Sequence, residues 1–111
     1  MSVPDEHVDL SPRELLERQR AGESWQLLDV REAWEIEIAK VESAVTIRMS
    51  EIQGRMQELD SDVPVAVLCH SGIRSAQVAA WLKIAGFRRV ANVTGGIDSW
   101  SLTVDASIPR Y

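Results

Sequence analysis

The most constraining feature of this sequence is the run VPVAVLC at residues 63–69, which is almost continuously apolar. A short run without polar alternation is typical of a strand that is buried on both faces, as in a parallel sheet covered by helices. The run ends at Cys69, and small and polar residues follow before a helical pattern begins. The sequence therefore predicts a central buried strand that delivers a cysteine to a short loop.

Strand and helix patterns alternate along the rest of the chain. Strands are predicted at 25–30, 43–47 and 89–93, and helices at 11–22, 32–40, 50–59, 74–85 and around Trp100. Ser11 with Glu14, and Ser50 with Gln53, have the spacing of helix-capping pairs. This alternation predicts an α/β fold in which a small central parallel β-sheet is flanked by helices, and residues 1–111 form a single domain.

Composition excludes several classes of function. The formal net charge is −5, with acidic and basic residues mixed, so we expect no nucleic-acid partner. The sequence has no apolar stretch long enough to span a membrane and no basic leader, so we expect a cytoplasmic location and no membrane partner. One cysteine without a Cys/His array predicts neither an internal disulfide nor a metal site, and we expect no cofactor.

The loop after the central strand has the composition of an anion cradle. In a parallel sheet, ligands bind beyond the carboxyl ends of the strands, and Cys69 lies at such an end. A helix N-terminus offers unpaired N–H groups and a positive dipole, which stabilise a thiolate. Gly72 permits a turn that aims amides inward, and Arg74 adds a cation nearby. The alternative interpretation is that Cys69 is a small buried core residue.

Three segments of the sequence, in order, resemble the rhodanese (thiosulfate:sulfur transferase) family. Cys69-His70-Ser71-Gly72-Ile73-Arg74-Ser75 resembles the family's C-x-x-G-x-R-S loop. LLDVRE at 27–32 resembles its D-V-R segment, and residues 80–100 resemble its helix, strand and G-G-x-x-x-W turn.

The resemblance implies a sulfurtransferase that moves a sulfane sulfur through a persulfide on Cys69. It implies that the amides of residues 70–74 hold the anionic sulfur and that Arg74 closes the loop. The residues that form the cradle are then His70, Ser71, Gly72, Ile73, Arg74 and Ser75. The implied partners are a small-molecule donor such as thiosulfate and a thiol or cyanide acceptor, with an acceptor protein as an alternative.

Some residues allow two interpretations. Asp29 and Arg31 follow a predicted strand, so Arg31 either attracts an anionic donor or forms an ion pair with Asp29 or Glu35. His70 either takes part in the chemistry or lies at the rim, and Ser75 either donates to sulfur or caps the helix. Residues 39–44 depart from the family's G-H-I-P-G-A stretch, which puts the shape of that turn in doubt.

Two other functions remain as alternatives. Phosphatases and arsenate reductases on a related fold resemble C-x5-R, whereas only four residues separate Cys69 from Arg74 here. The tighter loop suits a single sulfur atom better than a tetrahedral phosphate. A non-catalytic rhodanese-like binding or regulatory module is the second alternative, and the presence of Cys69, Gly72 and Arg74 argues against it.

Overall fold

The central sheet has five strands, and all of them are parallel. The computed structural model describes residues 7–111, in which the strands are β1 (His7–Leu10), β2 (Gln26–Asp29), β3 (Val45–Thr46), β4 (Val65–Leu68) and β5 (Val90–Val93). Their order across the sheet is β1-β5-β4-β2-β3. The strand that ends at the cysteine is therefore central, between β5 and β2. The predicted α/β fold with a parallel sheet is confirmed.

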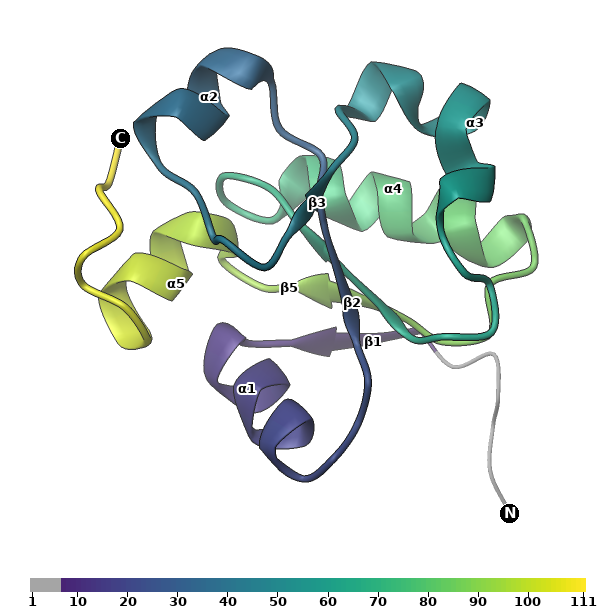
Figure 1. The fold of residues 1–111 in the computed structure, drawn as a ribbon, viewed down its shortest axis with the longest axis horizontal. Helices are drawn as coiled ribbons and strands as arrows, with labels where there is room; N and C mark the ends of the chain where they lie inside the picture. Colours follow the sequence, from purple (N-terminus) through teal and green to yellow (C-terminus); the bar gives the residue numbers. More distant parts are fainter. Residues whose placement is uncertain (1–6) are drawn as a thin grey trace.

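Helices cover both faces of this sheet (Figure 1). They are α1 (Pro12–Arg20), α2 (Ala33–Ile38), α3 (Ile52–Arg55), α4 (Ile73–Ile84) and α5 (Gly96–Thr103). The core has two parts: α1 and α5 pack against one face of the sheet, and α3 and α4 against the other. The short helix α2 lies beyond the carboxyl end of β2, on the side of the sheet where the Cys69 loop emerges.

Alternation along β4 divides its side chains between the two parts of the core. Ala66 and Leu68 join the part that includes α1 and α5, whereas Val65, Val67 and Cys69 join the part that includes α4. Successive residues of a strand point to opposite faces, so this pattern follows directly from the extended backbone. All four residues of β4 are buried, as the apolar run predicts.

Most of the predicted elements form, with three differences. The capping pair at Ser11 and Glu14 is present at the start of α1. The predicted capping pair at Ser50 and Gln53 is wrong, because Ser50 lies inside a 3-10 turn, Met49–Glu51. The helix α3 that follows is only four residues long, and a second 3-10 turn, Met56–Glu58, comes directly after it. The strand predicted at 43–47 is reduced to the two residues of β3, both of them exposed.

The third difference is β1, which the sequence did not predict. Its four residues include two polar ones, and it lies at the sheet edge, where it pairs only with β5.

Within the described part of the chain, no helix is long and apolar enough to cross a membrane. The expectation that there is no leader was drawn from residues 1–10, of which residues 1–6 lie outside the described residues.

Candidate active site

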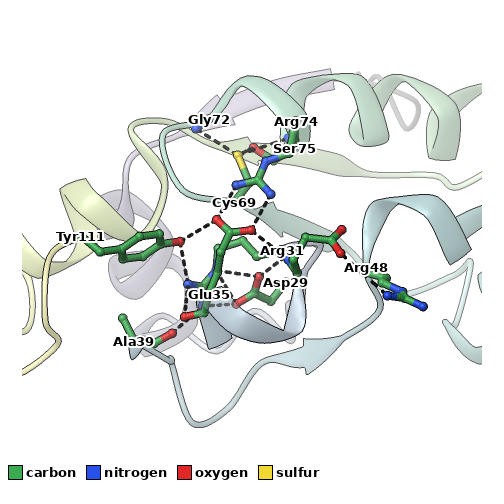
Figure 2. Close-up of polar contacts among 11 residues, drawn as sticks. Asp29, Arg31, Glu35, Ala39, Arg48, Cys69, Gly72, Arg74, Ser75 and Tyr111 are labelled. Carbon is green, nitrogen blue, oxygen red and sulfur yellow. Dashed lines mark hydrogen bonds and ion pairs between the residues drawn. The ribbon is translucent and has the colours of Figure 1, made fainter. Parts of the chain in front are cut away.

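The thiol of Cys69 lies beneath the loop that joins β4 to α4, and only 1% of the residue is exposed. Two backbone amides donate to its sulfur: the N–H of Gly72 lies 3.1 Å from Sγ and that of Ser75 lies 3.4 Å from it. The Ser75 hydroxyl is 3.2 Å from the same sulfur. The two amides, whose contacts with the sulfur can be followed in Figure 2, form a pair of fixed donors that suits an anionic sulfur.

Gly72 gives the loop its turn. It is the N-cap of α4 and has a φ of 106°, in the left-handed region that residues with a Cβ rarely adopt. This conformation directs its N–H toward Cys69 Sγ while its carbonyl accepts a hydrogen bond from Asn92 Nδ2 at 3.2 Å. Both backbone groups of Gly72 are therefore fixed.

Asn92 is a site residue that the sequence reasoning missed. It is buried on β5, accepts a hydrogen bond from the Ser75 hydroxyl at 2.5 Å and donates to Gly72. It therefore holds both of the residues whose amides reach the sulfur. The available signal was a single amide side chain in the otherwise apolar strand segment VANV, because a buried polar group needs partners.

The carbonyls of Cys69 and His70 are held by hydrogen bonds from α5. The N–H of Ile97 donates to the carbonyl of Cys69 at 2.8 Å, and that of Asp98 donates to the carbonyl of His70 at 3.2 Å. This contact requires Gly96, since a Cβ at that position would overlap the backbone of Cys69 and His70. The double glycine therefore serves close packing of α5 on the active-site loop.

Arg74 points into an ion pair with Glu35 (Figure 2). Its two terminal nitrogens donate to the two carboxylate oxygens, each at 2.7 Å. Glu35 is buried, and this pairing with Arg74 is the main cause that lowers its pKa to about 2. The structure thus brings Arg74 beside the loop, but its charge is compensated by Glu35, which the sequence analysis considered only as a partner of Arg31.

Asp29 and Arg31 form a fully buried ion pair rather than an anion-attracting surface. Arg31 Nη2 lies 2.7 Å from Asp29 Oδ2, and both residues have no exposed surface. The terminal nitrogens of Arg31 also donate to the carbonyls of Ala39 and Glu35 and to the hydroxyl of Tyr111. Of the two interpretations of Arg31, the structure shows the ion pair that fixes the loop, because a fully buried guanidinium does not meet solvent.

The remaining predicted residues lie around the mouth of the loop. His70 is half-buried and its ring stacks on Tyr111, with 4.1 Å between ring centroids. Ser71 and Ile73 are exposed, and 79% of Ile73 is accessible. The contacts to the sulfur in this structure come from Gly72 and Ser75, and the part predicted for His70, Ser71 and Ile73 in holding an anionic sulfur stays a prediction. No group of three or more His, Cys, Asp or Glu within residues 7–111 is placed to hold a metal ion.

The parallel sheet, the buried thiol beyond its central strand and the amides directed at the sulfur define a small α/β domain built around one loop-held cysteine. A family model described as a rhodanese-like domain matches residues 11–103, and the chain belongs to this family. In solved structures, the chain is similar to a rhodanese-related protein from Thermoplasma volcanium, with a TM-score of 0.77 and 31% identity over 87% of this chain and 93% of that one.

Curated relatives give the family a class of activity. The chain is 39% identical over 92 residues to the putative sulfurtransferase YtwF of Bacillus subtilis, a match that covers 83% of this chain and 88% of YtwF. It is 28% identical over 104 residues to the thiosulfate sulfurtransferase GlpE of Vibrio cholerae, covering 91% and 95%. These names support a transferase role.

One relative is much longer than this chain. The rhodanese-like/PpiC domain-containing protein 12 of Arabidopsis thaliana is 43% identical over 90 residues, which cover 78% of this chain but only 30% of that protein. The same domain therefore occurs both in small sulfurtransferases and as one part of a larger protein.

Proposed function

We propose that this chain is a sulfurtransferase that carries a sulfane sulfur as a persulfide on Cys69. The donor is a small molecule such as thiosulfate, and the acceptor is a thiol, cyanide or an acceptor protein. The transferase names of YtwF and GlpE support the class of reaction, and the name of GlpE suggests thiosulfate as the donor to test first.

The observation that carries this proposal is the pair of amides directed at Cys69 Sγ, from Gly72 at 3.1 Å and Ser75 at 3.4 Å. A sulfur that alternates between thiolate and persulfide keeps a negative charge throughout the cycle. Fixed N–H dipoles in a site closed to water stabilise such a charge without a general base. The single cysteine of the chain fits a cycle in which the acceptor comes from outside.

The reaction has two balanced displacements. The Cys69 thiolate attacks the outer sulfur of thiosulfate, so a new S–S bond forms, the old one breaks, and sulfite leaves with the bonding electron pair. An acceptor nucleophile then attacks the outer sulfur of the persulfide, and the Cys69 thiolate leaves with the electron pair of that S–S bond. The total charge is conserved in each step, and no oxidant or reductant is needed.

The ion pair of Arg74 favours this reaction over phosphate transfer. In a phosphatase loop an arginine must face the phosphate oxygens, whereas both terminal nitrogens of Arg74 here donate to Glu35 at 2.7 Å. The fixed donors that remain around Sγ suit one sulfur atom. The intact cradle also argues against a non-catalytic module, which has no need for a buried thiol with two aimed amides.

Thiocyanate formation from thiosulfate and cyanide tests the proposal. The wild-type protein is expected to show double-displacement kinetics, with parallel lines in double-reciprocal plots, because each substrate reacts with a different form of Cys69. The Cys69→Ser variant is expected to be inactive while keeping its unfolding midpoint in urea. Thiocyanate formation by Cys69→Ser would contradict the proposed function. So would a wild-type protein that hydrolyses an aryl phosphate but forms no thiocyanate.

A further inference from the structure

The segment after α5 folds back along the domain and ends beside the active-site loop (Figures 1 and 2). Ile108 is buried in the core, and its carbonyl accepts a hydrogen bond from the Ser101 hydroxyl at 2.6 Å. Arg110 pairs with Asp98 at 2.7 Å. These anchors fix the position of Tyr111, a residue to which the sequence analysis gave no role.

The hydroxyl of Tyr111 bridges two buried charges. It donates to Glu35 Oε1 at 2.8 Å and accepts from Arg31 Nη1 at 2.9 Å. Glu35 Oε1 is also the oxygen that Arg74 Nη2 reaches at 2.7 Å. Tyr111 therefore belongs to the same hydrogen-bonded chain that holds Arg74, at the start of α4.

The ring of Tyr111 makes a second and independent contact with the loop. It lies flat on the imidazole of His70, with 4.1 Å between centroids and 11° between planes, and the edge of Trp34 approaches it at 6.2 Å. His70 directly follows Cys69. The ring of Tyr111 thus contacts the first residue of the loop, and its hydroxyl contacts Glu35, which in turn pairs with Arg74 at the far end of the loop.

We propose that Tyr111 is a positioning residue for sulfur transfer, holding both ends of the Cys69 loop so that the amides of Gly72 and Ser75 stay aimed at Sγ. The inference rests on the proposed function and adds a part that acts through His70 and Glu35 rather than on the sulfur itself. Donors fixed before the reaction stabilise developing charge better than mobile ones. Loss of Tyr111 is therefore expected to slow the transfer step more than it weakens donor binding.

The ionisation of Tyr111 gives a spectroscopic test of the contact. Burial, and then its hydrogen bond to Glu35, raise the pKa of Tyr111 to about 12 from the ordinary value of 10.0. It is the only tyrosine of the chain, so the near-ultraviolet absorbance of phenolate reports this residue alone. In the folded protein, phenolate is expected to appear about two pH units later than in the urea-unfolded chain.

Single-turnover sulfur loading and amide hydrogen exchange of Tyr111→Ala and Tyr111→Phe test the proposal. In Tyr111→Ala, we expect the rate constant for loading from thiosulfate to fall about tenfold, with the half-saturating donor concentration changed less than about twofold. Exchange is expected to rise in residues 70–75 but not in β4 or α1. Tyr111→Phe retains the stack on His70 and is expected to stay within about threefold of the wild type. Ser107→Ala is the control from the same segment, and neither quantity should change.

Three results would overturn the role of Tyr111. They are unchanged or faster loading in Tyr111→Ala, a rise in exchange spread over the whole domain, and a Tyr111→Phe variant that loads more slowly than Tyr111→Ala. Faster loading would make the segment a lid instead. If the wild-type protein takes up no sulfur from the donor, only the proposed function is contradicted. The amide hydrogen exchange of residues 70–75 in Tyr111→Ala still shows whether Tyr111 positions the loop.

Discussion

Gly72 shows at the scale of one residue how backbone conformation creates the cradle. Its N–H reaches Cys69 Sγ only from a left-handed φ of 106°, and its carbonyl is held by Asn92. A side chain at this position meets the α5 turn as well, since a Cβ would lie 3.3 Å from the amide nitrogen of Gly95. The reactivity of Cys69 therefore depends on a neighbouring glycine as much as on the thiol.

Gly72→Ala is expected to lower the free energy of unfolding by about 1–2 kcal/mol, because an L-residue is strained at this φ. It should also slow sulfur loading by about tenfold or more, because the loop relieves the strain by moving a donor away from Sγ. Gly22→Ala is the matched control: Gly22 has a φ of 99° with nothing within 4 Å of a Cβ. Urea unfolding should show a similar loss of stability in both variants, whereas loading should fall only in Gly72→Ala. Equal loading in the two variants would contradict the role given to Gly72.

The residues of the site differ in how far the sequence alone predicts their place in it. Cys69, Gly72 and Ser75 lie within one local segment, so a strand, a turn and a helix start predict their arrangement. Other site residues are distant in the sequence from the residues that they contact. The separation is 17 residues for Asn92 and Ser75, 39 for Glu35 and Arg74, and 80 for Tyr111 and Arg31. No local pattern predicts such contacts. Arg31 was predicted near the site with two possible roles, and only the structure shows that it forms an ion pair with Asp29.

At the scale of elements, the site depends on two helices that meet the loop from different directions. The start of α5 holds the carbonyls of Cys69 and His70, and α2 presents Glu35 to Arg74 at the start of α4. The sequence pattern predicted both helices, at 32–40 and around Trp100. It failed for β1 and α3, where the edge position and the short 3-10 turns weaken the pattern.

The ion pair between Glu35 on α2 and Arg74 on α4 makes the free energy of unfolding depend on pH. The folded-state pKa of Glu35 is about 2, below the ordinary value of 4.5. Its contribution is therefore fully present above about pH 4.5 and is lost as the pH falls toward 2. In Glu35→Gln, we expect a loss on the order of 3 kcal/mol in the free energy of unfolding near neutral pH.

Urea unfolding of the wild type and Glu35→Gln across this pH range provides the measurement. The difference between the two proteins should be largest at neutral pH and should shrink as the solution becomes more acidic. Glu58→Gln is a control on an exposed ion pair with Arg55, for which a much smaller difference is expected because solvent screens the two charges. A Glu35→Gln difference that stays constant down to pH 2 would contradict the assignment.

At the scale of the whole molecule, the two parts of the core serve to place one strand end. The central position of β4, between β5 and β2, brings Asn92 and Asp29 to the edge where Cys69 emerges. The C-terminal segment then reaches the same edge and adds Tyr111. The site thus draws on residues from Asp29 to Tyr111, although its chemistry belongs to one loop.

The location of the transferred sulfur tests the central claim most directly. Wild-type protein should be incubated with thiosulfate isotopically labelled in its outer sulfur, and then analysed by intact mass and by peptide mapping. We predict a gain of one labelled sulfur on the peptide that contains Cys69, its loss on addition of a thiol or cyanide, and recovery of unlabelled sulfite. No mass gain in the wild type, or the same gain in Cys69→Ser, would contradict the account.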